Sequence, residues 1–265
     1  MWKQGPDNLV SWTSSLPFAL VYMFHLHANA RDGSDFEDIQ LCIVDTTCLP
    51  RGIFVRDLDL IRAYSSHDVD LAETEKLRTL RQGGRFYFGE YLSQGALKIE
   101  GGCDIVSASA LIDQGLFDLQ PVFKDFAQWQ KAYSPPWAYP VLHLRENISQ
   151  KAIRTSTADI LRAVVGITQL FGSRWRLPMA INLVASLCYG ERHFLVMNLF
   201  DGKDFTGLIP FVMFEDNLTS ADGERIECSP SKTKVVSCDS LPEVRQVENL
   251  MQSIYEEFCL MRMTG

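Results

Sequence analysis

The stretch that sets the first helix is Ser11-Trp12-Thr13-Ser14-Ser15, followed by LPFALVYMFHLHAN at positions 16–29. The second part is apolar at most positions and has a proline near its start, where proline suits the first turn of a helix. Ser14 or Ser15 can cap this helix by accepting a hydrogen bond from a backbone N–H of its first turn. The sequence therefore predicts a helix over 17–29, preceded by more hydroxyl groups than one cap requires.

Strand and helix patterns alternate over the first 134 residues. Residues 39–44 are apolar at nearly every position, which predicts a strand covered on both faces. The same patterns predict helices at 57–64, 73–82, 108–114 and 122–133, and short strands at 85–88 and 103–107. This half is expected to be of mixed α+β class.

A break in the pattern occurs at Ser134-Pro135-Pro136. Two consecutive prolines remove backbone donors and disfavour helix just before them, so a domain boundary is expected here. The predicted units are an α+β domain at 1–134 and a helix-rich region at 135–265. The second unit carries helix patterns at 156–170 and 177–188, strand patterns at 193–200 and 208–214, and a polar loop at 217–240.

The last predicted helix starts at Ser240-Leu241-Pro242-Glu243, which has the form of a capping box with a proline in the first turn,. Apolar residues then recur at helical spacing along one face. Such a stripe favours packing in the core over a groove for a partner. Its members are Leu241, Val244, Val247, Leu250, Met251, Ile254 and Phe258.

Composition and charge exclude several classes of protein. Of the 265 residues, 46% are apolar and 22% are charged, which excludes a disordered chain,. The 25 basic and 33 acidic residues give a net charge of −8, so nucleic acid is not expected as a principal partner,. No apolar run reaches the ~18 residues that cross a membrane. The run at 16–24 lacks the positive start of a signal peptide, so we expect a cytoplasmic protein, with secretion as the alternative.

Cysteine and aspartate patterns give no indication of a metal. The seven cysteines are odd in number and contain no C-x-x-C pair, which is typical of buried, reduced thiols in an intracellular protein,. Asp57, Asp59, Asp68 and Asp70 lack calcium-loop spacing and are expected to form a solvated acidic face. The cysteines are Cys42, Cys48, Cys103, Cys188, Cys228, Cys238 and Cys259.

Two constellations have the residue types of a chemical site. The first is the hydroxyl cluster at 11–15, with Tyr22 on the helix that follows. The second is Gly89-Glu90-Tyr91-Leu92-Ser93-Gln94-Gly95, where a carboxylate follows a predicted strand end, a place where sites gather,. Helix capping and a solvated loop glutamate are the structural alternatives for the two constellations.

Together these motifs resemble known proteins at two levels. Residues 9–120 resemble the ADP-ribosyltransferase-like fold. With Cys48-Leu49-Pro50-Arg51-Gly52, most of the chain resembles a fungal family of uncharacterised domains. The first resemblance implies a split β-sheet with flanking helices and with NAD as the substrate between its halves.

The resemblance also implies roles for single residues. Glu90 would be the catalytic carboxylate, holding the ribose 2′-hydroxyl and stabilising the positive charge that develops as nicotinamide leaves. Thr13 or Ser14 would orient Glu90, and Tyr22 would pack near the nicotinamide. These three and Ser11 form the implied NAD-binding group.

The sequence departs from the family pattern in two places. The strand arginine or histidine that grips the dinucleotide has no counterpart in residues 1–10, which indicates a degenerate enzyme or a chain shortened by one strand at its start. Phe88 occupies the position where arginine-modifying members carry an acidic residue, which argues against arginine as the acceptor. Two hypotheses remain: an NAD-dependent ADP-ribosyltransferase with an unidentified acceptor, and a catalytically inactive interaction protein that retains the fold.

Overall fold

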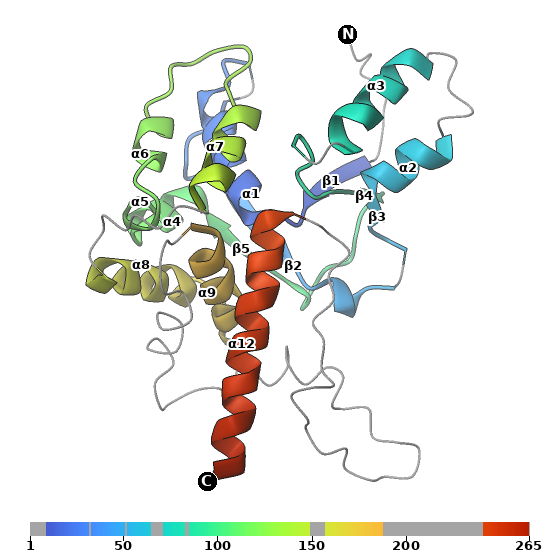
Figure 1. The fold of residues 1–265 in the computed structure, drawn as a ribbon. Helices are drawn as coiled ribbons and strands as arrows, with labels where there is room; N and C mark the ends of the chain where they lie inside the picture. Colours follow the sequence, from blue (N-terminus) through green and yellow to red (C-terminus); the bar gives the residue numbers. More distant parts are fainter. Residues whose placement is uncertain are drawn as a thin grey trace, which may run out of the picture.

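The described part of the chain folds into helices and two small antiparallel sheets, an α+β structure (Figure 1). The computed structural model describes residues 9–31, 33–50, 52–64, 71–82, 85–148, 157–187 and 241–264. The strands are β1 (Leu9–Thr13), β2 (Gln40–Val44), β3 (Val55–Arg56), β4 (Glu90–Gln94) and β5 (Cys103–Ser107). The helices are α1 (Leu16–Ala28), α2 (Asp57–Tyr64), α3 (Leu71–Gln82), α4 (Ala108–Asp113), α5 (Leu116–Leu119), α6 (Phe123–Phe126), α7 (Ala138–Ile148), α8 (Thr157–Gln169), α9 (Ser173–Leu187) and α12 (Pro242–Thr264), with a 3₁₀ turn at Thr46–Cys48.

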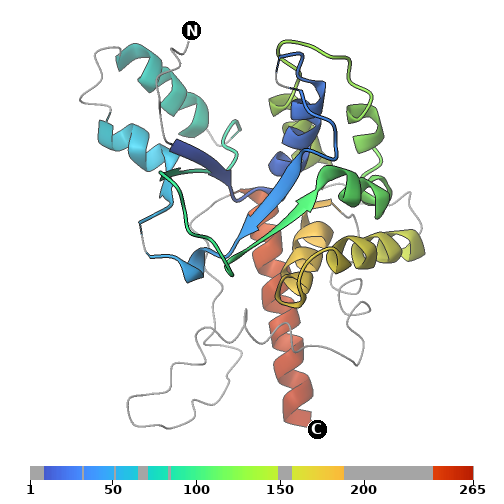
Figure 2. The same ribbon diagram turned by 180° about the vertical axis from the view of Figure 1, so that it is seen from behind.

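The strands form two separate sheets. One has the order β1-β4-β3, and its register places Thr13 opposite Glu90. The other consists of β2 and β5, with Cys42 opposite Ile105, and the two strands run side by side in the view from behind (Figure 2). Helices α2 and α3 lie beside the three-stranded sheet, away from the helices that follow β5 (Figures 1 and 2).

Helix α1 forms where the opening stretch predicts it. Ser15 is the N-cap, and its Oγ accepts a hydrogen bond from the Phe18 N–H at 3.3 Å. Proline lies in the first turn, where its missing N–H has no helical partner to lose,. Leu20 and Phe24 are at most 1% exposed, so this helix runs through the interior of the protein.

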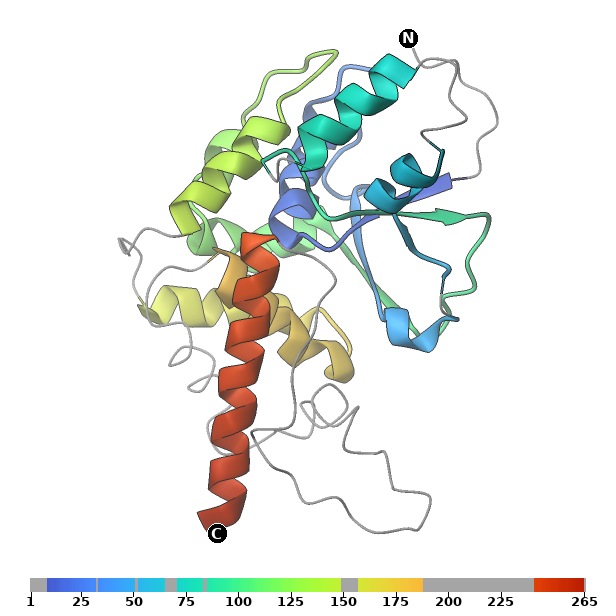
Figure 3. The same ribbon diagram turned by 45° about the vertical axis from the view of Figure 1, so that its right-hand side comes forward.

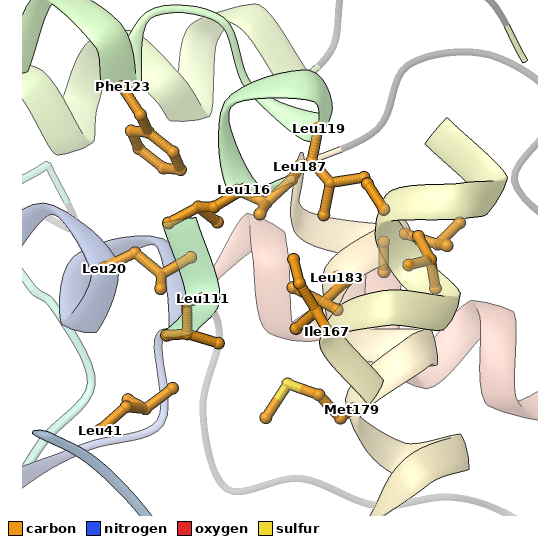
Figure 4. Close-up of a cluster of buried hydrophobic side chains, with 14 of the residues drawn as sticks. Leu20, Leu41, Leu111, Leu116, Leu119, Phe123, Ile167, Met179, Leu183 and Leu187 are labelled. Carbon is orange, nitrogen blue, oxygen red and sulfur yellow. The ribbon is translucent and has the colours of Figure 1, made fainter. Parts of the chain in front are cut away.

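The apolar core lies between α1, the helices after β5 and α9 (Figure 4). Leu20, Leu111 and Phe123 come from the first half of the chain, and Ile167 and Leu183 from the second. Helix α12 adds Leu250 and Ile254 to the same cluster, with Val247 and Met251 packed against it. The prediction that this stripe packs in the core is confirmed for these four residues, while the Phe258 side chain lies outside the described part.

Three local predictions were wrong. Residues 85–88 form no strand, and the strand starts instead at Glu90. The predicted helix 122–133 is a single turn, because the Ala132 N–H donates to Ala28 O and Ala132 O accepts from the Ala30 N–H. Strand β2 is not covered on both faces: Leu41 is buried, but Gln40 is exposed and its remaining residues are half-buried. These outcomes depend on contacts between distant segments.

Among the described elements, β1, β3, α5, α7 and the 3₁₀ turn were not predicted from the sequence. Strand β1 contains three residues of the hydroxyl cluster, and α7 begins just after the double proline. The segments 193–200, 208–214 and 217–240 lie outside the described residues. Among the residues that are described, no helix is both long and apolar enough to cross a membrane.

Candidate active site

Glu90 is the first residue of β4 and lies opposite Thr13 of β1. Its side chain is 24% exposed, so the carboxylate is half-buried and not the solvated group of a loop. Gly89 before it has φ of +67°, a left-handed conformation that favours glycine,. This turn leads the chain into β4 and sets the direction of the backbone where Glu90 begins the strand.

Three consecutive carbonyl groups before Glu90 each accept a hydrogen bond. Tyr87 O accepts from Arg145 Nη1 at 2.8 Å, and Phe88 O accepts from Thr13 Oγ1 at 2.6 Å. Gly89 O accepts from the Ser14 N–H at 2.9 Å. The backbone that carries Glu90 is therefore held by the hydroxyl-cluster segment and by α7.

The hydroxyl cluster supports this backbone. Thr13 Oγ1 donates to Phe88 O and also accepts from the Ser15 N–H at 3.0 Å. Ser15 Oγ caps α1 and donates to Glu243 Oε1 at 2.5 Å. Ser11 lies in β1 opposite Leu92, two residues along the ladder from Thr13. The structure thus brings the cluster and the Glu90 motif together, while the Thr13 hydroxyl is engaged with the backbone.

The Glu90 carboxylate forms an ion pair with Arg81 on α3. Arg81 Nη2 lies 2.8 Å from Glu90 Oε2, and Arg81 Nη1 bonds to Asp57 Oδ2. Asp57 is 3% exposed, so the expected solvated acidic face is wrong for this residue. The sequence pattern suggested otherwise because Asp57 starts a short polar helix. Its burial arises from tertiary packing, which includes the ion pair with Arg81 of α3.

Burial is the main influence on the Glu90 carboxyl. It raises the pKa of Glu90 above its usual value, because desolvation disfavours the charged form,. The positive charge of Arg81 opposes this shift, and the negative charge of Asp57 adds to it. Arg81 is therefore the group that favours an ionised Glu90.

Tyr22 is connected to the Glu90 segment by a row of aromatic rings. Its ring is stacked on Phe18 at 5.7 Å, and Phe18 is stacked on Phe88 at 5.3 Å. On its other side, Tyr22 stacks on His25 at 4.9 Å. Tyr22 lies between Phe18 and His25 and is 39% exposed, so it retains an accessible surface.

Arg145 and Glu243 are two site-supporting residues that the sequence did not reveal. Arg145 Nε donates to both carboxylate oxygens of Glu243 at 2.9 Å, and Nη2 donates to Oε1 at 2.7 Å. The guanidinium also lies over the Phe88 ring, 5.0 Å from its centroid. Glu243 is 1% exposed and is the buried counter-ion of Arg145, although its sequence pattern indicated a helix cap. A glutamate in the first turn gives no local indication of a partner 98 residues away.

The described cysteines are less buried than expected. Cys48 is exposed, and Cys42 and Cys103 are half-buried on the β2–β5 sheet, whose one face is open. Burial and the neighbouring Cys103 raise the pKa of the Cys42 thiol. Within the described ranges, no group of three or more His, Cys, Asp or Glu side chains is arranged to hold a metal ion.

Comparisons with known proteins find no relative of this chain. No family model matches it, and neither does any curated protein or solved structure. The geometry around Glu90 and the motifs of the sequence are therefore the basis for any functional proposal.

Proposed function

We propose that the protein is an NAD-dependent ADP-ribosyltransferase in which Glu90 is the catalytic carboxylate. One observation supports this above the others: Glu90 begins a strand paired with the hydroxyl-cluster strand, on a backbone held at three successive carbonyls. A fixed, half-buried carboxylate is suited to stabilising a developing positive charge, because it needs little rearrangement as the charge appears. The acceptor is unidentified, and no nucleic acid or membrane is proposed as a partner.

The proposed reaction breaks the bond between the nicotinamide nitrogen and the ribose anomeric carbon. The electron pair of that bond leaves with nicotinamide, and the ribose becomes positively charged. Glu90 would accept a hydrogen bond from the ribose 2′-hydroxyl and stabilise this charge until a nucleophile of the acceptor bonds to the anomeric carbon and releases its proton. Tyr22, which is 39% exposed, would pack near the nicotinamide.

We propose that the activity is cytoplasmic. Cys42, Cys48 and Cys103 are free thiols. Free thiols are the usual state of cysteine in that compartment.

The test is NAD binding and nicotinamide release by the wild type and by Glu90→Gln. We expect both to bind NAD, with release slower by about 100-fold or more in the variant, because a neutral amide stabilises a cation poorly. Glu100→Gln is the control, since Glu100 is exposed in the turn before β5 and should leave release unchanged. Absence of saturable NAD binding by both the wild type and Arg81→Gln would overturn the proposed function.

A second candidate is a catalytically inactive interaction protein with the same fold. Two observations favour it: Arg81 is paired with the Glu90 carboxylate, and the Thr13 and Ser15 hydroxyls bond to the protein itself. NAD binding with equal nicotinamide release by the wild type and Glu90→Gln would favour this candidate.

A further inference from the structure

The Glu90 carboxylate is covered by a side chain of the same protein. Arg81 extends from the last turn of α3, and its guanidinium bonds to Glu90 Oε2 with one nitrogen and to Asp57 Oδ2 with the other. Arg81 is 20% exposed, and the Asp57 side chain is 4% exposed. The Arg81 guanidinium thus forms a half-buried bridge between the carboxylates of Glu90 and Asp57.

We propose that Arg81 is an autoinhibitory latch, a planar cation that occupies the Glu90 carboxylate until α3 withdraws. This inference rests on the proposed function, which assigns the same carboxylate to the ribose of NAD. The ribose of NAD, positively charged in the transition state, would need the place that the guanidinium holds. Ligand and latch therefore compete for one carboxylate.

The attachment of α3 is suited to such a movement. None of the described residues in the apolar core cluster comes from α2 or α3, and Leu80 on α3 is 51% exposed. Figures 1 and 3 show α3 at the edge of the molecule, beside α2. An element with few buried apolar contacts opens at a lower free energy than the core does. The polar bridge from Arg81 is then a major attachment of this helix to the sheet.

Asp57 retains stabilisation when the latch opens. It is the first residue of α2, where the helix dipole favours a carboxylate,. Asp57 Oδ1 has no hydrogen-bond partner within the described part of the chain. Withdrawal of Arg81 therefore removes the hydrogen bond to Asp57 Oδ2 and leaves the helix dipole as the favourable interaction described for this carboxylate,.

The experiment uses a charge-neutral variant of the full chain, Asp57→Asn with Arg81→Gln. It removes one negative and one positive charge together, so the net charge near Glu90 is unchanged and the buried Asp57 carboxylate is not left without its partner. The matched control is Glu75→Gln with Arg78→Gln, which removes a partly exposed ion pair within α3 that does not include Glu90. Far-UV circular dichroism and thermal unfolding check that both variants fold.

Two measurements are made on each protein. The first is the rate at which a water-soluble carbodiimide couples glycine ethyl ester to Glu90, followed by peptide mass spectrometry. The second is the Kd for NAD. If the latch is open about a tenth of the time, its removal should raise both the coupling rate and the NAD affinity about tenfold, and the control should match the wild type.

The outcomes separate the latch from the proposed function. Faster coupling without NAD binding by any protein supports the latch and overturns the function. Equal coupling and equal NAD affinity in the wild type and the variant overturn the latch and leave the function standing. Weaker NAD binding by the Asp57→Asn, Arg81→Gln variant would also overturn the latch, because these residues would then be contacting the ligand.

Discussion

At the scale of single residues, Gly89 and Thr13 determine how Glu90 is presented. A Cβ on Gly89 would lie 2.1 Å from Ser14 Oγ and 2.9 Å from Leu241 Cδ1, so both its conformation and its surroundings require glycine. Thr13 holds the carbonyl of the preceding residue, Phe88. The Glu90 carboxylate is thereby placed where burial raises its pKa and the positive charge of Arg81 lowers it.

The raised pKa of Glu90 predicts a pH dependence of stability. A carboxyl whose pKa is higher in the folded state stabilises the fold below its usual value of 4.5, and this contribution is lost as the pH rises through the folded value,. Between pH 4.5 and the folded pKa, the free energy of unfolding of the wild type should therefore fall relative to that of Glu90→Gln as the pH rises,. At higher pH the difference between the two proteins should stay constant. Urea unfolding of both proteins over a pH series measures this. A difference that stays constant, or that grows in favour of the wild type with rising pH, would contradict the prediction.

At the scale of elements, the first turn of α12 is connected to the strand that carries Glu90. Glu243 of α12 binds Arg145 of α7, and Arg145 donates to Tyr87 O just before β4. Glu243 also accepts from Ser15, the cap of α1. Four segments that are distant in sequence thus meet at one buried ion pair.

Glu243→Gln should destabilise the protein by about 3–5 kcal/mol, because Arg145 would be left as a buried charge without its counter-ion. The measurement is the free energy of unfolding in urea. Glu256→Gln, on the exposed side of the same helix, should change it by no more than about 0.5 kcal/mol,. Equal effects of the two substitutions would mean that the buried pair contributes little.

At the scale of the whole molecule, the core joins the two halves of the chain. Phe24 of α1 is fully buried against Phe123, and both belong to the cluster that contains Leu183 of α9 and Ile254 of α12. Only the far end of α12 extends past the other described elements (Figures 1–3). The division at residue 134 stays a prediction, and the shared core makes one cooperative unit the simpler expectation.

Leu183→Ala tests this expectation. Removing a side chain that is 1% exposed should destabilise the fold by about 2–5 kcal/mol through lost burial and the cavity left behind,. The unfolding transitions measured by tryptophan fluorescence and by far-UV circular dichroism should shift together to lower urea concentration, as expected for one cooperative unit. Fluorescence is informative here because Trp12 and Trp175 lie in opposite halves of the chain. Leu80→Ala, at an exposed position, is the control. Two separate transitions, only one of them shifted, would instead support independent domains.

The sequence by itself determined the elements whose signals are local. Residues 57–64 and 103–107 form the predicted helix and strand with the same bounds, and a serine before the proline turn caps α1. The apolar stripe of α12 also packs as its spacing indicates. Caps, turns and periodicity act between residues a few positions apart, so they can be recognised without a fold.

Only the tertiary structure decided what surrounds Glu90. Arg81 and Asp57 come from helices whose own patterns indicate exposed polar surface, and Arg145 comes from a helix that the sequence did not predict. The one-turn length of α6 likewise depends on hydrogen bonds to residues about 100 positions earlier. These features arise when distant segments meet and exclude water from charged groups, and no local pattern in the chain records which segments will meet.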